Sequence, residues 1–392
     1  MTTIDFMGQA QAMRAELVAV RRDLHLHPEL GFEEVRTAGI VAQTLRDLGL
    51  EVQTGVGQTG VVAILEGDSD GPTVLVRADM DALPIDEEND AEYISLATGK
   101  MHACGHDGHT SIGLGVAKLL MPYKARIAGR VKFVFQPAEE IAGGALAMIA
   151  DGVLENPRPD VSLGLHLWNS LPLGQIGVAE GPVMAGSSKF KILITGHGGH
   201  GAQPQQTQDP VICAAHIITA LQTIISRNLN PADTGVISVT TMQAGDAHNV
   251  IPQQVELTGT MRAFKTDVRD LLTRRMEEVA KGVGTALGCL VDVEVKHTTI
   301  PLVNSAVVGA RLRPVFSKLV GETQLDDTAR TMGGEDMAFL MNDIPGMFFF
   351  VGSANAERGL DFGHHHPRFD FDEDALPLGV GLLAAAVGEY VI

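Results

Sequence analysis

The chain contains a short segment that is unusually rich in metal-binding side chains. Residues 101–109 read Met-His-Ala-Cys-Gly-His-Asp-Gly-His and precede an apolar stretch that is predicted to be a helix. Cys104 and His106 flank a single glycine, so a tight turn can direct both side chains at one site. A lone cysteine or histidine is more often an ordinary buried or surface residue, but a cluster of this density favours a metal site.

Two glutamates further along the chain could join such a site. Glu139 and Glu140 follow the apolar run 131–135, which Pro137 ends, so both carboxylates lie at the tip of a predicted strand, where the ligands of α/β sheets gather. Adjacent residues point in different directions, so one glutamate can bind a metal while the other faces a water molecule. An acidic pair on a solvated loop is the ordinary alternative for these residues taken alone.

Three more segments hold potential ligands. His166 lies within or just after an apolar run, where a single histidine is often only a hydrogen-bonded core residue. Asp79 and Asp81 follow the run 73–78 and are two residues apart, so they lie on the same side if the strand continues. They can bind a metal, orient a ligand histidine or cap a turn. The last segment, Gly-His-His-His-Pro-Arg-Phe at 363–369, should leave at least one histidine free to enter a site.

The elements that position these residues indicate an α/β protein with an insertion. The first part of the chain alternates helical spacing with apolar runs, several of them apolar on both faces, as in the central strands of a mixed sheet. From about Lys189 the order becomes strand, helix, strand, strand, helix, strand, which is typical of a ferredoxin-like module. We therefore predict a three-layer, mixed-sheet catalytic domain over residues 1–185 and 299–392, interrupted by a ferredoxin-like α+β domain over residues 186–298.

Composition excludes several other classes of protein. With 45% hydrophobic and 20% charged residues, the chain is typical of a soluble globular enzyme. A net charge of −19 with scattered basic residues argues against nucleic-acid binding. The three cysteines are widely spaced and odd in number, which disfavours a disulfide framework. The first eight residues lack a secretion signal, and the nearest membrane candidate, residues 375–387, is shorter than the ~18 residues of a span, so we expect a cytoplasmic protein without membrane partners.

Taken together and in order, these motifs resemble one enzyme family. It is the family of aminoacylases, hippurate hydrolases and indoleacetyl-amino-acid hydrolases, which are co-catalytic metallopeptidases. The match spans nearly the whole chain and is highly specific as a set. The motifs that carry it are His-Leu-His-Pro-Glu-Leu-Gly (25–31), Arg-Ala-Asp-Met-Asp-Ala-Leu-Pro (77–84), His-Ala-Cys-Gly-His-Asp-Gly-His (102–109), Gln-Pro-Ala-Glu-Glu (136–140), Gly-Gly-His-Gly-Ala (198–202), Gly-Gly-Glu-Asp-Met-Ala (333–338) and His-His-Pro-Arg-Phe (365–369).

The resemblance implies a set of ligands for two divalent metal ions. Within the triple histidine, the family pattern of His, any residue, Pro and then an aromatic residue two further on fits His365. Asp81 is expected to orient a ligand from behind, and Glu139 to act as the general base. One thiolate favours Zn²⁺, whereas carboxylate and imidazole suit Mn²⁺, Co²⁺ or Ni²⁺ as well. The implied ligands are Cys104, His106, Glu140, His166 and His365.

The inserted domain resembles the family's lid, which commonly also builds a dimer interface, so a homo-oligomer, either a dimer or a tetramer, is expected. His200, Asn249 and Arg262 match lid positions that contact the scissile carbonyl or the substrate carboxylate. A simple turn residue in a glycine-rich stretch is the alternative for His200.

The predicted activity is hydrolysis of the amide bond of a small-molecule N-acyl amino acid, of the hippurate or N-acetyl-amino-acid type, by metal-activated water. Glu139 is expected to take the proton of that water and pass it to the leaving amine. One alternative is a small dipeptidase or carboxypeptidase of the same clan. Another is an amidase with Cys104 as the nucleophile, activated by His106 or His102. A binding protein that lost catalysis is a third, against which the intact Glu139 argues.

Overall fold

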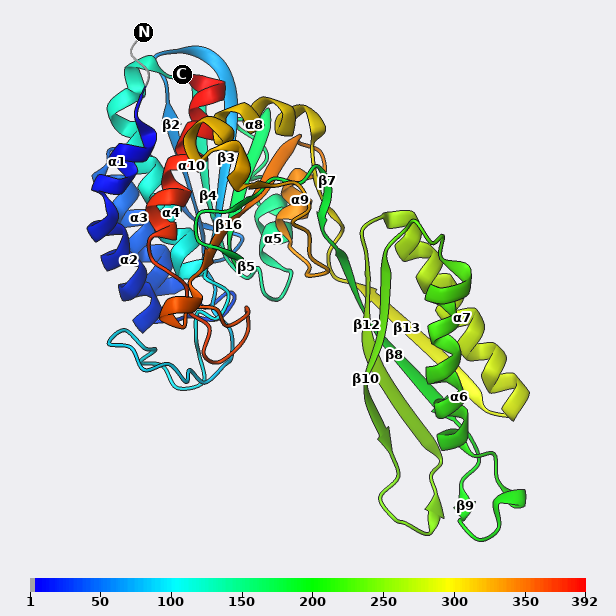
Figure 1. Ribbon diagram of the computed structural model, residues 1–392. Coiled ribbons are helices and arrows are strands. Elements are labelled where there is room, and N and C mark those ends of the chain that lie inside the picture. Colours follow the sequence, from blue (N-terminus) through cyan, green and yellow to red (C-terminus); the bar gives the residue numbers. More distant parts are fainter. Residues whose placement is uncertain (1–3) are drawn as a thin grey trace. The chain divides into compact units, whose positions relative to one another are not determined.

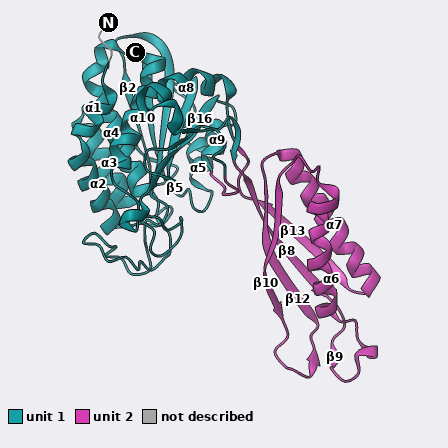
Figure 2. Ribbon diagram, viewed as in Figure 1, with its two compact units in different colours: residues 1–183, 303–330, 336–392 teal, residues 184–302, 331–335 magenta. Residues whose placement is uncertain are grey.

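The structure is a computed structural model that describes residues 4–392, and the chain forms two compact units (Figure 2). Unit 1 runs to Val183 and resumes over Val303–Arg330 and Asp336–Ile392. Unit 2 consists of Met184–Leu302 and Thr331–Glu335. The second unit is therefore an insertion into the first.

Unit 1 is built on a mixed eight-stranded sheet with the order β1-β2-β4-β3-β5-β16-β6-β15. The central strands β4, β3, β5 and β16 run parallel, whereas β1 and β2 are antiparallel to their neighbours. The strands are β1 (Glu51–Val56), β2 (Gly60–Glu66), β3 (Ser69–Asp79), β4 (Ala128–Gln136), β5 (Val161–Pro172), β6 (Ile176–Gly177), β15 (Leu325–Asp326) and β16 (Gly346–Ala354).

Helices cover both faces of this sheet (Figure 1). Alternate residues of β5 show the two faces, because Leu165 packs near Gly379 of α10 while Gly164 packs tightly on Met337 of α9. This arrangement confirms the predicted three-layer α/β class. The helices of unit 1 are α1 (Phe6–Ala12), α2 (Arg14–Leu26), α3 (Val35–Asp47), α4 (His106–Leu120), α5 (Gly144–Ala150), α8 (Ala306–Val320), α9 (Met337–Met341) and α10 (Ala375–Val391), with short helices η1 (Met121–Arg126), η4 (Glu322–Gln324) and η5 (Ala356–Arg358).

Unit 2 has the predicted order of strand, helix, strand, strand, helix, strand. Its antiparallel sheet has the order β10-β12-β8-β13, and both helices pack on one face through a core that includes Ile192, Leu257 and Leu272. The main elements are β8 (Gly186–Thr195), α6 (Pro210–Thr223), β10 (Gly235–Ala244), β12 (Gln254–Ala263), α7 (Thr266–Leu287) and β13 (Leu290–His297). The short elements are β9 (Gly199–His200), η2 (Pro204–Gln206), η3 (Ile224–Asn228) and β11 (Val250–Ile251), and β7 (Gly181–Met184) and β14 (Leu302–Asn304) lie where the chain passes between the units.

The structure adds one helix to the candidate membrane span that the sequence analysis considered. Among the described residues, Pro210–Asn228 is long and apolar enough to cross a membrane by length and composition, whereas the sequence analysis singled out only residues 375–387. The buried third of this helix packs into the core of unit 2, where Cys213, Ile217 and Leu221 are fully enclosed. The core helix of a globular domain has the same composition, and α6 packs in this way.

A buried ion network ties α2 to the first turn of α4. Arg21 Nε donates to Asp107 Oδ2 at 2.8 Å, and Arg21 Nη2 donates to Asp370 at 2.7 Å. The imidazole of His25 lies 2.7 Å from Asp107 Oδ2 through Nδ1 and 3.1 Å from Glu87 through Nε2. Burial and the charge of Arg21 lower the pKa of His25, but Asp107 and Glu87 outweigh them and raise it to about 9. His25 is therefore an imidazolium between two carboxylates at neutral pH.

This network predicts a pH-dependent contribution to stability. The pKa of His25 is about 9 in the folded chain against 6.5 when unperturbed, so its contribution is complete below pH 6.5 and is lost as the pH rises through 9. We expect His25→Gln to lower the free energy of unfolding by about 3 kcal/mol at pH 6, and the difference from wild type to shrink towards pH 10.

Urea unfolding of the wild type and of His25→Gln between pH 6 and pH 10 measures this difference. His216→Gln, which changes an exposed histidine of unit 2, is the matched control and should show no such trend. A His25→Gln deficit of constant size across the whole range would contradict the assignment.

Candidate metal centre

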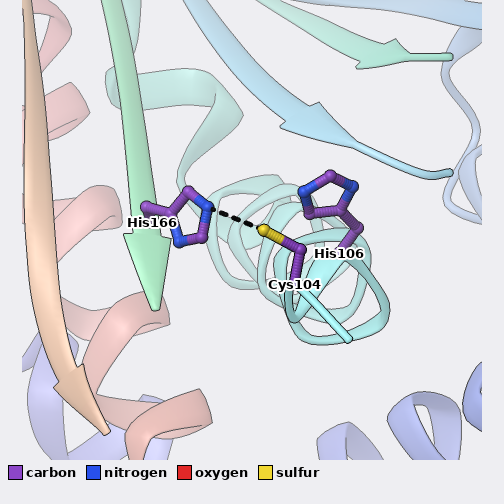
Figure 3. A group of neighbouring side chains, drawn as sticks. All are labelled: Cys104, His106 and His166. Atoms are coloured by element: carbon purple, nitrogen blue, oxygen red, sulfur yellow. Dashed lines mark hydrogen bonds between the residues drawn. The ribbon is translucent and has the colours of Figure 1, made fainter. Parts of the chain in front are cut away.

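Six side chains from separate stretches of unit 1 lie together at one end of its central strands. The ligand atoms of Cys104, His106 and His166 lie within 4.8 Å of one another (Figure 3). The same holds for Cys104 with Glu140 and His365, and for His106 with Glu139 and Glu140. Because these groups share members, the five ligands and the base expected from the resemblance form one cluster.

The turn before α4 directs two of these ligands. Gly105, the N-cap residue of α4, has a left-handed backbone with φ +87°, a conformation that favours glycine. The chain therefore reverses between Cys104 and His106, and both side chains point at the same site (Figure 3). Both are buried, with Cys104 9% exposed and His106 0% exposed.

The two buried ligand imidazoles, His106 and His166, each have one ring nitrogen engaged by the protein. His106 Nδ1 lies 3.2 Å from Asp81 Oδ1, and the buried His106 Nε2 has no hydrogen-bond partner among the described residues. His166 Nδ1 donates to the carbonyl oxygen of Leu167 at 2.6 Å, and its Nε2 lies 3.5 Å from Cys104 Sγ. The Nδ1–H tautomer thus leaves the Nε2 lone pair of both rings available to a cation.

The residues present fit divalent cations. Within the described part of the chain, the buried atoms His106 Nε2 and Glu140 Oε1 have no hydrogen-bond partner, an arrangement that is costly unless another group satisfies them. A cysteine, three histidines and a carboxylate are a donor set that suits Zn²⁺ and neighbouring transition metals.

Protons compete with a cation for these lone pairs. Burial lowers the pKa of His106, but Asp79, Asp81 and Glu140 outweigh it and raise the pKa to about 10. Burial, together with Glu140 and Glu139, raises the pKa of the Cys104 thiol well above its ordinary value. A thiol in such surroundings is not activated as a nucleophile, which counts against the cysteine amidase alternative. A divalent cation would displace both protons and compensate the carboxylates.

Asp81 holds two parts of the centre at once. Its Oδ1 faces His106, and its Oδ2 accepts the backbone N–H of Glu140 at 3.0 Å. It therefore orients one ligand ring and the loop that carries another ligand, as a group behind the ligands does. Glu139 is 9% exposed, and its Oε1 accepts the backbone N–H of Asp336 at 3.4 Å.

Asp79 and His109, whose roles the sequence left open, support the centre from behind. Asp79 Oδ1 lies 2.6 Å from His109 Nδ1, and Asp79 Oδ2 accepts from Arg77 at 2.6 Å. His109 Nε2 accepts the N–H of Leu167 at 2.9 Å, so both of its ring nitrogens are engaged. His109 therefore has no lone pair to offer a cation. His102 is buried, and burial lowers its pKa to about 3.

Sequence reasoning missed Asp336 as a residue of this region. Its Oδ1 accepts from Gln136 at 2.5 Å and from Arg77 at 3.3 Å, and its Oδ2 accepts the N–H of Ala145. The Gly-Gly-Glu-Asp-Met-Ala motif at 333–338 was the available signal, but nothing in its local pattern indicated these partners.

The three consecutive histidines have different environments. The side chain of His365 is 54% exposed, and its Nε2 lies 3.4 Å from Glu140 Oε1. His364 is part-buried, and burial lowers its pKa to about 4, so it is neutral. The His366 ring stacks on Phe362 with centroids 4.6 Å apart. The structure therefore places His365 with the cluster and its two neighbours outside it.

Comparison with known proteins agrees with this geometry. The sequence profile of peptidase family M20/M25/M40 matches residues 75–389. The chain is a member of this family. It is 40% identical to IAA-amino acid hydrolase ILR1-like 4 of Arabidopsis thaliana over 96% of this chain and 86% of that protein. It is 38% identical to N-acetylcysteine deacetylase of Bacillus subtilis (strain 168) over 93% and 94% of the two chains.

Solved structures with the same fold include members of the M20 family. The YXEP protein of Bacillus subtilis, described as a dinuclear metal binding peptidase from the M20 family, is 35% identical with a TM-score of 0.83, over 97% of this chain and 100% of that one. A structure from methicillin-resistant Staphylococcus aureus is 31% identical with a TM-score of 0.91, over 99% of each chain. The protein is accordingly a hydrolase of the M20/M25/M40 family.

The three lid residues that the resemblance singled out all lie in unit 2. His200 and Asn249 are near each other, whereas Arg262 lies far from both. His200 pairs with Val250 in the small β9–β11 sheet, and the carbonyl of Asn249 accepts the N–H of Gly201 at 2.8 Å. Arg262 lies at the other end of β12, where it donates to the hydroxyl of Ser187. Arg262 lies eight residues along β12 from Gln254, the end nearer to His200, which is roughly 26 Å at strand spacing. A small substrate cannot reach His200 and Arg262 of one lid at the same time.

The environment of Cys104 predicts a slow reaction with alkylating reagents. The thiol is buried among carboxylates that raise its pKa, so little thiolate forms at pH 7.5. We expect iodoacetamide to label Cys104 of the metal-stripped, folded protein at least tenfold more slowly than in the urea-unfolded chain, as measured by peptide mass spectrometry. Rapid labelling of the folded chain at Cys104 would favour the cysteine-nucleophile alternative instead.

Proposed function

We propose that this M20/M25/M40 hydrolase cleaves the amide bond of N-acyl amino acids, of the hippurate or N-acetyl-amino-acid type, and releases a carboxylic acid and a free amino acid. One observation carries the proposal: the five candidate ligand side chains lie together beside Glu139, and two of their buried atoms, His106 Nε2 and Glu140 Oε1, have no hydrogen-bond partner among the described residues. The names of the relatives, N-acetylcysteine deacetylase and IAA-amino acid hydrolase, support this substrate class.

Two divalent cations, Zn²⁺, Mn²⁺, Co²⁺ or Ni²⁺, are the proposed cofactors. The ligand groups Cys104–His106–His166 and Cys104–Glu140–His365 can each hold one ion, since they share only the thiol. The description of the similar YXEP protein as a dinuclear metal binding peptidase supports this number. When bound, the ions would polarise the amide carbonyl and acidify water, which is the chemistry that the side chains alone do not supply.

The residues of this chain then supply positioning and proton transfer. Glu139, held by the N–H of Asp336, takes the proton of the attacking water as the new C–O bond forms, and then delivers it to the leaving nitrogen as the amide C–N bond breaks. Asp81 keeps His106 in the Nδ1–H tautomer throughout. From the lid, we propose that Arg262 binds the substrate carboxylate and that His200 and Asn249 contact the scissile carbonyl.

A small dipeptidase or carboxypeptidase activity is the second candidate. The chain is 38% identical to thermostable carboxypeptidase 2 of Saccharolobus solfataricus over 93% of this chain and 92% of that protein. A peptide bond and an N-acyl amide present the same carbonyl to the centre, so the two activities differ in what surrounds the leaving group.

The assembly and the compartment are proposed on physical grounds. His200, in the small β9–β11 sheet, and Arg262, near the far end of β12, lie far apart within unit 2, so a homo-oligomer, a dimer or a tetramer, would let a second copy provide one of them to a substrate. The three cysteines are free and buried, in keeping with the reducing environment of the cytoplasm.

Replacement of Glu139 tests the base directly. We expect Glu139→Gln to keep the metal content of the wild type and to lower kcat by roughly 10²- to 10⁴-fold, because a neutral amide accepts no proton. Turnover of N-acetyl amino acids and metal content by elemental analysis are measured on the same samples. A variant with full turnover would show that another group is the base.

Removal and replacement of metal tests the cofactor and the substrate class together. We expect dialysis against a chelator to abolish hydrolysis and added Zn²⁺, Mn²⁺, Co²⁺ or Ni²⁺ to restore it. A panel of N-acetyl, benzoyl and indoleacetyl amino acids with dipeptides as competitors separates the two candidate activities. Activity that survives complete removal of metal would refute the metal-dependent mechanism.

A further inference from the structure

His364 connects two stretches of chain that each carry a ligand. Its Nε2 donates to the carbonyl oxygen of Leu167 at 2.9 Å, one residue beyond His166 in β5. Its ring stacks on Trp168 with centroids 4.5 Å apart and an interplanar angle of 27°. The buried Phe369 packs on it at 4.9 Å. His364 thus fixes the loop that contains His365 against β5, the strand that contains His166.

The peptide of Leu167 is the point at which these contacts meet. Its oxygen accepts from His166 Nδ1 at 2.6 Å as well as from His364 Nε2, and its N–H donates to His109 Nε2. The carbonyl that fixes the tautomer of His166 therefore also fixes the position of His364.

His365 depends on this anchoring more than the other ligands do. Its side chain is 54% exposed, whereas His106 and His166 are buried, so packing does little to restrain it. Its backbone has a left-handed φ of +67°, which residues other than glycine adopt uncommonly and at a cost that the surroundings must offset. The surroundings are the anchored His364 on one side and the bond from the N–H of His365 to the carbonyl of Ala103, beside Cys104.

We propose that His364 is a positioning residue that holds His365 in its strained conformation and thereby sets the affinity of the metal site that His365 and Glu140 share. The inference rests on the proposed function, because it takes the cluster to bind two ions. Without the bond to Leu167, the loop relaxes and His365 must be ordered again each time a cation binds, which weakens that site. The His166 ring also touches that of His364, with centroids 5.1 Å apart, but it keeps its own bond to Leu167, so the site of Cys104, His106 and His166 is affected less.

Two variants remove the donor and one retains it. His364→Phe keeps a flat ring against Trp168, and His364→Leu removes the ring as well; in both, the oxygen of Leu167 remains satisfied by His166. His364→Gln keeps an amide N–H that can reach the same oxygen. His366→Phe is the matched control, since His366 belongs to the same triple but faces Phe362 rather than Trp168.

Binding of Co²⁺ to the metal-stripped full-length proteins is measured by titration calorimetry. Quenching of Trp168, the single tryptophan of the chain, is followed in parallel because its ring lies 5.3 Å from that of His166. We expect His364→Phe and His364→Leu to weaken one of two Co²⁺ sites by roughly 10- to 100-fold, the range for residues that orient metal ligands. His364→Gln should recover to within a few-fold of the wild type, and His366→Phe should match it.

The inference would be overturned if the wild type and both donor-deficient variants bound Co²⁺ with equal affinity. It would also be overturned if His366→Phe lost as much Co²⁺ affinity as the His364 variants.

Hydrolysis of N-acetyl amino acids by the wild type is assayed separately. A wild type that binds two Co²⁺ ions but hydrolyses no N-acyl amino acid contradicts the proposed substrate class while the comparison of affinities still decides the role of His364.

Discussion

The centre depends on one constraint: in each buried ligand histidine, one ring nitrogen is held by a protein group, which leaves the other nitrogen for the site. His106 uses Nδ1 on Asp81, and His166 uses Nδ1 on the carbonyl of Leu167, so both rings present Nε2 to the site. The tautomer of each ring is thus set by a neighbour that lies within β5, for Leu167, or just after β3, for Asp81. The sheet fixes Leu167, which pairs with Val351 of β16, and Asp81 follows the end of β3, so the strands bring both neighbours to the site where the lone pairs converge.

The same sheet explains how an acidic protein tolerates so many buried carboxylates. Arg77 on β3 pairs with Asp79 and Asp336, and Arg21 on α2 pairs with Asp107, so these carboxylates are compensated by buried guanidinium groups. Among the described residues, Glu140 has no guanidinium partner and lies instead against His106, His365 and Cys104. The uncompensated negative charge of the region is therefore concentrated where a cation would bind, and the compensated charge serves to hold the turn and the strand ends in place.

Much of this could be predicted from the sequence because the signals were local. Apolar runs predicted the central strands, Asp209 and Pro210 mark the start of α6 as N-cap and first residue, and the spacing of Cys104 and His106 indicated the turn at Gly105. The positions of Asp336 and His364 were not predictable, since their partners lie about 200 residues away in the chain. The separation of His200 from Arg262 was also not predicted from the sequence. A matched motif identifies the residues that belong to it, but it does not say how far apart the fold places them.

The candidate metal ligands and the candidate substrate contacts lie in different units of this chain. The five candidate ligands and Glu139 lie in unit 1, whereas the three candidate substrate contacts lie in unit 2, which has its own hydrophobic core. Relatives of 38% to 40% identity carry names as different as N-acetylcysteine deacetylase, IAA-amino acid hydrolase and carboxypeptidase. Such a range is expected where one centre attacks an amide carbonyl and a separately packed unit contacts the rest of the substrate, because residues of the second unit can change without disturbing the lone pairs of the first.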